Sequence, residues 1–200
     1  MPKDAAQPDV LRALVIDRFT EVATEPQRET KFPVGPESAK KLGFQVAEVD
    51  SLPSAVTESF CGVGNPFLMG NPQLGQTILD LGRGAGFDTL LAAGRVGASG
   101  KVVGVDMTLE MITKARHAAS SLGISNVVFI RGNIEALPLA SSSVDLVVSN
   151  EVFNLCPDKP KVLGEVFRVL KPGGRLQMAD ILLEPHVTPE ELATKGSWSD

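Results

Sequence analysis

Short runs of apolar, mostly β-branched residues alternate with longer helical patterns from residue 76 onward. This alternation is typical of βαβ units, in which a parallel sheet is covered by helices. We predict five strands, at residues 77–81, 101–106, 127–131, 144–149 and 175–181. The pattern therefore predicts an α/β fold.

Helical spacing fills the gaps between these strands. One predicted helix follows Thr108 as its N-cap and ends at Gly123. Another spans about 159–170 and ends at a Lys-Pro-Gly-Gly run, because proline and glycine stop helices. Its predicted buried face consists of Val162, Leu163, Val166, Phe167, Val169 and Leu170.

The first 75 residues lack this regular alternation of strand and helix patterns. Apolar residues at helical spacing predict an amphipathic helix over 9–24, ending before Pro26. Residues 25–75 are rich in proline and glycine, which favours an irregular arm with short helical turns. We therefore divide the chain into an arm and lid, 1–75, and a ligand-binding domain, 76–200. Within the arm, we expect Glu58–Pro66 to close over a ligand.

The C-terminal end of the pattern is short for an open sheet. Thr188 to Glu191 form a capping box with proline at the first helical position, which predicts that a helix begins there. The printed sequence ends at Asp200, about one element later, before the strand pair that such sheets often carry. Either the chain is a fragment or this pair is missing. An exposed edge strand at 175–181 would favour pairing with another chain, for example in a homodimer.

Composition narrows the class of protein. With 43% hydrophobic and 22% charged residues, the 200-residue chain resembles a soluble globular domain. Its net charge of -5, without a basic cluster, argues against nucleic acid as a partner. We find no signal peptide or membrane-spanning stretch and expect a cytoplasmic protein. Cys61 and Cys156, 95 positions apart, lack metal-site spacing, so we expect no metal.

The stretch Ile78–Asp88 carries the strongest chemical signal. An apolar strand runs into Gly82, Gly84 and Gly86 and then into a helix. Glycines there allow a sharp turn and close approach of a ligand at the carboxyl edge of a parallel sheet, which indicates a nucleotide-type ligand. The sixth position is Phe87 rather than glycine or alanine, which argues against a dinucleotide.

Two further strand ends complete this candidate site. The second strand ends in Asp106, 24 residues after Gly82, where a carboxylate would accept hydrogen bonds from ribose hydroxyls. Met107 beside it could lie against a purine. After the third strand, Asn133 and its neighbours could read the edge of the same base.

These residues resemble the class I S-adenosylmethionine-dependent methyltransferases. The resemblance rests on DLGRGAGFD, GVDMT, RGNIEALP, VSNEVFNL and VLKPGGRL, in that order, within residues 76–183. It implies a Rossmann-like sheet with strand order 3-2-1-4-5 and S-adenosylmethionine as cofactor. The resemblance assigns the methionyl part to Asp80, Gly82, Gly84 and Gly86, the ribose to Asp106 with Met107, and the adenine to Asn133 and Ile134.

Within this class, GVGNP, GVDMT and VFNL followed by PDK most resemble the arsenite methyltransferase branch. That branch holds trivalent arsenic through cysteine thiolates. Here Val63 and Glu151 stand where the branch has cysteines, and a further cysteine is expected just beyond Trp198. Arsenite methylation by this chain would therefore require Cys61 and Cys156 to converge.

Asn150 and Glu151 end the fourth strand, which in this fold faces the transferable methyl group. The Glu151 carboxylate could act as a base toward an O–H or N–H nucleophile, so both residues are the candidate catalytic pair. We expect methyl transfer to a small-molecule acceptor by in-line displacement. Arsenite methylation stays an alternative, as does a cofactor-binding module or inactive homologue that acts through a partner chain.

Overall fold

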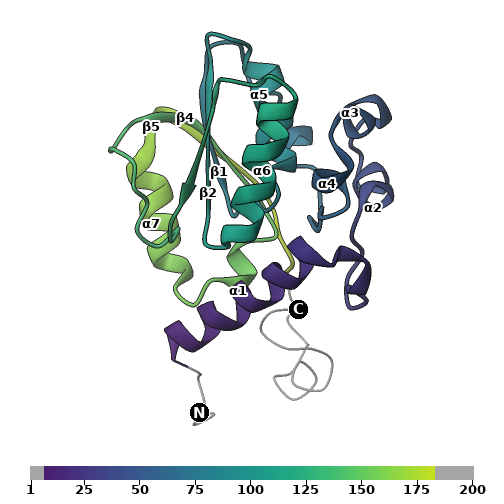
Figure 1. Cartoon of the computed structure of the whole chain (residues 1–200). Helices are drawn as coiled ribbons and strands as arrows, with labels where there is room; N and C mark the ends of the chain where they lie inside the picture. The colour runs from purple at the N-terminus through teal and green to yellow at the C-terminus, as the bar shows by residue number, and fades with distance from the viewer. Residues whose placement is uncertain (1–6, 183–200) are drawn as a thin grey trace.

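The computed structural model describes residues 7–182, which contain one five-stranded parallel sheet (Figure 1). Its strands are β1 (Thr77–Leu81), β2 (Lys101–Asp106), β3 (Val127–Arg131), β4 (Val144–Asn150) and β5 (Leu170–Ala179). They lie in the order β3-β2-β1-β4-β5, and every pairing is parallel. The predicted α/β fold and strand order are confirmed.

The strand bounds match the prediction except that β4 ends one residue later, at Asn150, and that both ends of β5 differ. We expected this strand at 175–181, but it begins five residues earlier, directly after the preceding helix, and ends at Ala179. Val144 pairs with Leu170, whereas Leu146 pairs with Arg175, so the Lys-Pro-Gly-Gly run forms an irregularity within the strand. The strand therefore spans a run that sequence rules treat only as a helix stop, and Gly173 within it has φ of +79°.

Helices cover both faces of the sheet. α5 (Phe87–Val96) and α6 (Leu109–Ser121) pack on one apolar core, and α7 (Lys159–Val169) packs on the other. The buried face predicted for α7 was partly wrong, because Phe167 is 84% exposed and Leu163 is 48% exposed. Only one valine stripe of α7 faces the sheet, namely Val162, Val166 and Val169.

The N-terminal region consists of α1 (Pro8–Thr24), α2 (Pro36–Lys41), α3 (Val46–Ser51) and α4 (Ser54–Thr57), with 3₁₀ turns at Pro26–Arg28 and Pro66–Met69. Phe44 and Phe60 of this region pack against Phe87 of α5, with ring centroids 5.0 and 4.5 Å away. The arm therefore shares the core of the sheet. In Figure 1, α1 lies across the lower end of the α/β unit, beside α6.

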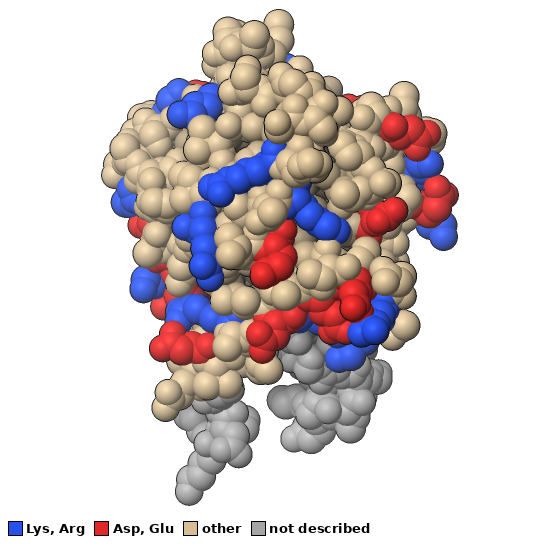
Figure 2. All heavy atoms as spheres, in the orientation of Figure 1, with Lys and Arg blue, Asp and Glu red and all other residues tan. Residues whose placement is uncertain are grey.

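Surface charge and helix composition both bear on the sequence-based expectations. Figure 2 shows side chains of both charges on the face of Figure 1. Among residues 7–182, no helix is both long enough and apolar enough to cross a membrane. The helix predicted from Thr188 lies outside the described residues.

Candidate functional site

The loop between β1 and α5 depends on glycine at two positions for different reasons. Gly82 has φ of +58°, and a Cβ there would lie 2.6 Å from the side chain of Val152, so the loop packs tightly on the segment after β4. Gly84 has φ of +52°, and no atom lies closer than 4.0 Å to its Cβ position. Gly84 therefore leaves open space above the backbone.

The carboxylate of Asp106 ties this loop to the end of β2. Its Oδ2 accepts a hydrogen bond from the Gly84 amide at 2.9 Å, and its Oδ1 accepts one from the Thr108 amide at 2.8 Å. Burial raises the pKa of Asp106, while these hydrogen bonds and the charge of Arg83 oppose the rise. Each carboxylate oxygen keeps acceptor capacity for a ligand hydroxyl.

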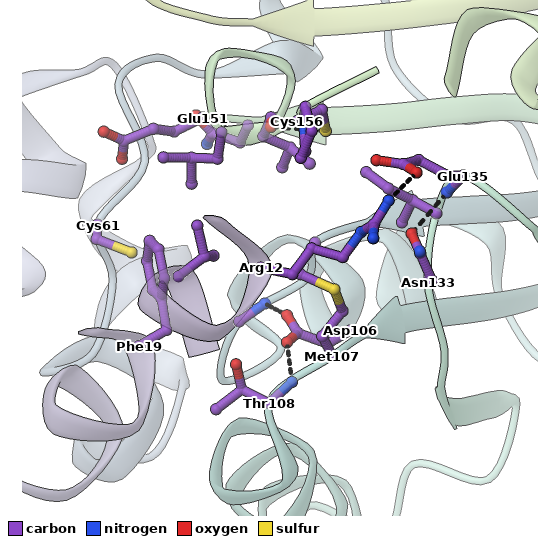
Figure 3. A pocket seen from close by; sticks show the side chains of 18 residues that line it. Arg12, Phe19, Cys61, Asp106, Met107, Thr108, Asn133, Glu135, Glu151 and Cys156 are labelled. Atoms are coloured by element: carbon purple, nitrogen blue, oxygen red, sulfur yellow. Dashed lines mark hydrogen bonds and ion pairs between the residues drawn. The ribbon is translucent and has the colours of Figure 1, made fainter. Parts of the chain in front are cut away.

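A pocket that opens to solvent lies at these strand ends (Figure 3). Eight of the ten predicted site residues line it: Gly82, Gly84, Asp106, Met107, Asn133, Ile134, Asn150 and Glu151. Asp80 lines an adjoining recess instead, and Gly86 lines neither space. In Figure 3, Asn133 and Glu135 lie at one end of the pocket, and Glu151 and Cys61 lie toward the other.

The adjoining recess contains two buried carboxyl groups, Asp80 and Asp88. Asp80 accepts a hydrogen bond from the Thr89 hydroxyl at 2.5 Å. Asp88 accepts one from the Asn150 amide at 3.1 Å, but its Oδ1 is buried without a partner among the described residues. Burial raises the pKa of Asp88 to about 6 and holds the pKa of Asp80 well above its usual range. An unpartnered carboxylate oxygen in a recess suits a ligand ammonium group.

Arg83 lies beneath the glycine loop and is 5% exposed. Its side chain crosses β2 at Gly104, where a Cβ would lie 2.0 Å from the Arg83 Cδ. The guanidinium stacks 4.6 Å from the Phe129 ring centroid, and its charge acts on both Asp80 and Asp106. A glycine inside a strand often marks such a close approach, which is the signal that could have located this side chain.

Helix α1 forms one wall of the pocket, through Arg12, Val15 and Phe19. The Arg12 guanidinium donates a hydrogen bond at 2.5 Å to Glu135, which lies in the loop after β3 (Figure 3). From the predicted lid segment Glu58–Pro66, Cys61 contributes to this pocket. The sequence marked α1 as amphipathic but carried no signal for what its apolar side would cover.

Asn150 is fully engaged by its neighbours. Its Oδ1 accepts hydrogen bonds from the amides of Val63 and Gly64 at 3.0 and 3.3 Å. Its Nδ2 donates to the Gly64 carbonyl at 2.9 Å and to Asp88 at 3.1 Å. A Cβ on Gly62 would lie 2.3 Å from this amide, so the arm backbone is pressed against the end of β4. Asn150 thus fastens the arm to the sheet.

Glu151 adopts φ of +58°, a left-handed conformation that is uncommon for a residue with a side chain. The residue is 7% exposed, and its Oε2 has no partner among the described residues. Burial, together with the charges of Asp180 and Glu29, raises the pKa of Glu151 to about 8. Strain and an unpartnered carboxyl group in one residue are typical of functional sites.

Both cysteines line the same pocket, from the arm and from the segment after β4. The Cys156 thiol donates a hydrogen bond to the Val152 carbonyl at 3.2 Å. Burial raises the pKa of Cys156 to about 12 and holds that of Cys61 well above its usual range. Both groups are therefore thiols at neutral pH. Within residues 7–182, no group of three or more His, Cys, Asp or Glu side chains is placed to hold a metal ion.

Comparison with known proteins places this geometry in context. Residues 73–199 match a family model described as a methyltransferase domain. The chain is 44% identical over 144 residues to an arsenite methyltransferase of Halobacterium salinarum, covering 72% of this chain and 37% of the relative. It is 37% identical over 115 residues to a ubiquinone/menaquinone biosynthesis C-methyltransferase of Escherichia coli, covering 56% of this chain and 46% of the relative.

Among solved structures, the chain is similar to an arsenic(III) S-adenosylmethionine methyltransferase from Chlamydomonas reinhardtii. The TM-score is 0.63 at 44% identity, with 67% of this chain and 47% of the other covered. The chain spans less than half the length of these relatives.

Proposed function

The chain belongs to the methyltransferase-domain family of class I S-adenosylmethionine-dependent enzymes, close to the arsenite methyltransferase branch, and from this we propose that it transfers a methyl group to a small-molecule acceptor. One observation carries the proposal: the glycine loop, the Asp106 carboxylate and Asn133, separated in sequence, line one pocket. This convergence is what a nucleoside cofactor requires.

The residues present fit S-adenosylmethionine. Asp106 keeps acceptor capacity toward the pocket, and Gly84 leaves the backbone open to a ligand. The adjoining recess offers the unpartnered Asp88 oxygen to the ammonium of the methionyl part. In this proposal Asp106 holds the ribose, Asn133 and Ile134 hold the adenine, and the glycine loop with Asp80 holds the methionyl part.

When bound, the cofactor supplies an electrophilic methyl group on a sulfonium. The chain itself supplies position and a proton acceptor. Asn150 fixes the arm at the end of β4, and α1 closes the side of the pocket, so an acceptor would be held in line and away from water. Glu151 would take the proton from the acceptor, since a pKa of about 8 suits a general base near neutral pH.

Arsenite methylation is the second candidate, because both thiols line the pocket and relatives carry this activity. It would require both thiols to ionise on binding arsenic, against the burial that raises their pKa. Labelling of Cys61 and Cys156 with N-ethylmaleimide, with and without trivalent arsenic, tests it. Protection of both thiols would favour arsenite, and unchanged labelling would exclude it.

The main proposal is tested by calorimetric titration with S-adenosylmethionine and S-adenosylhomocysteine, with NAD as a control ligand. We expect both sulfur nucleotides to bind, and Asp106→Ala to weaken both by at least about tenfold, because two charge-assisted hydrogen bonds to the ribose are lost. The exposed Asp50→Ala serves as the matched control and should bind normally. Equal binding of NAD, or binding unaffected in Asp106→Ala, would contradict the proposal.

A further inference from the structure

One end of the pocket contains the buried carboxyl group of Glu151, and one of its oxygens has no hydrogen-bond partner among the described residues. The Glu151 side chain reaches this end, near Cys61, as Figure 3 shows. Its Oε2 is excluded from solvent and receives no hydrogen bond from residues 7–182. Leaving a carboxyl oxygen in this state costs free energy, which a bound hydrogen-bond donor would recover.

The charges around Glu151 are negative. The carboxylate of Asp180, whose charge acts on Glu151, accepts hydrogen bonds from the amides of Val152, Phe153 and Asn154 at 3.3, 2.8 and 3.2 Å. Glu29 also acts on Glu151, and its own carboxylate pairs with Arg18. The Cys61 thiol, also at this end, stays neutral.

The cationic group in the wall of the pocket is already engaged. Arg12 is the one cationic side chain among the described residues that line it, and its guanidinium bonds Glu135 and Asp9. Glu135 belongs to the opposite end of the pocket from Glu151 (Figure 3). An anionic acceptor would therefore meet buried carboxyl groups without a compensating cation.

Most of the pocket wall is apolar. The pocket that Glu151 lines has apolar side chains from α1 and from the segment after β4, namely Val15, Phe19, Val152 and Leu155. A ligand that fits has an apolar body and a single strong donor. An ammonium group satisfies this best, because a charged donor to a buried carboxylate bonds more strongly than a hydroxyl does.

We propose that the methyl acceptor is an amine with an apolar body, and that its protonated nitrogen binds the carboxylate of Glu151. This proposal rests on the methyltransferase function proposed above. The nitrogen gives its proton to Glu151, its lone pair forms the new N–C bond, and the methyl C–S bond breaks with its electron pair left on sulfur. Glu151 then releases the proton to water.

The test compares three probes of matched apolar length: n-hexylamine, hexan-1-ol and hexanoate. Each is titrated into protein saturated with S-adenosylhomocysteine, and binding is followed by saturation-transfer NMR. We expect hexylamine to bind at least about tenfold more tightly than hexanol, and hexanoate to bind most weakly. Glu151→Gln should bring the amine and alcohol within about threefold, whereas the exposed Glu21→Gln should keep the preference.

A second measurement needs no variant. Because Glu151 must ionise to pair with the ammonium, hexylamine affinity should rise from pH 6 to pH 8 and binding should release protons to buffer. Equal binding of hexanol or hexanoate, binding of none of the three, or an amine preference that survives in Glu151→Gln would overturn the proposal. Failure of S-adenosylhomocysteine to bind in the preceding titration would instead contradict the cofactor assignment.

Discussion

Replacing Glu151 by glutamine should change how the stability of this protein depends on pH. In the fold, the Glu151 carboxyl stays protonated up to about pH 8, whereas its ordinary pKa is 4.5. Between these values the folded state holds one more proton than the unfolded state. The free energy of unfolding therefore falls as the pH rises through this window. Glutamine cannot ionise, so the variant lacks this loss.

The structure sets the size of the effect. The gap between 4.5 and about 8 corresponds to about 5 kcal/mol, at roughly 1.4 kcal/mol for each pH unit. Glu151 is 7% exposed, so solvent screens this cost little. Asp80, Asp88 and Asp106 also carry a raised pKa, but they are present in both proteins. Their contributions cancel in the difference between variant and parent.

Urea unfolding of the parent, Glu151→Gln and the exposed Glu21→Gln, at several values between pH 5 and pH 8, measures this difference. We expect the advantage of Glu151→Gln to grow by about 4 kcal/mol between pH 5 and pH 8, because this window spans about three of the pH units over which the folded state keeps the extra proton. Glu21→Gln should follow the parent within about 0.5 kcal/mol at each pH. Parallel profiles for the parent and Glu151→Gln would refute the argument that this carboxyl is held neutral.

Three further substitutions probe the packing around the site. Gly104→Ala should destabilise the fold by about 1–3 kcal/mol in urea unfolding, because its Cβ would lie 2.0 Å from the Arg83 Cδ; a neutral result would mean that Arg83 moves freely. Gly164 lies in the middle of α7, and no atom lies within 4 Å of the position that a Cβ would take. Gly164→Ala should therefore stabilise the fold by about 0.5–1 kcal/mol, because alanine loses less conformational freedom in a helix than glycine does. Asn150→Ala removes the hydrogen bonds to the arm, so N-ethylmaleimide should label Cys61 faster; unchanged labelling would show that other contacts hold the arm.

The sequence predicted the elements whose signals are local. Strand positions followed from short β-branched runs, and the Gly82 loop from its spacing behind an apolar strand. Eight of the ten predicted site residues line the pocket because parallel strands end at one edge, so residues that follow them must lie together. Asn133 and Asp106 could be placed at this edge for the same reason.

Tertiary structure decided everything that depends on what a surface packs against. Periodicity makes Phe167 and the valines of α7 equally apolar, and only the packing of α7 in the fold shows that the valines are buried and Phe167 is exposed. Periodicity likewise predicted that α1 has an apolar side, but only the fold shows that this side lines the pocket. The raised pKa of Glu151 comes from its burial in the fold and from the charges of Asp180 and Glu29, which are distant in sequence. Local sequence sets which conformations a segment favours, whereas burial and charge depend on long-range neighbours that appear only in the folded chain.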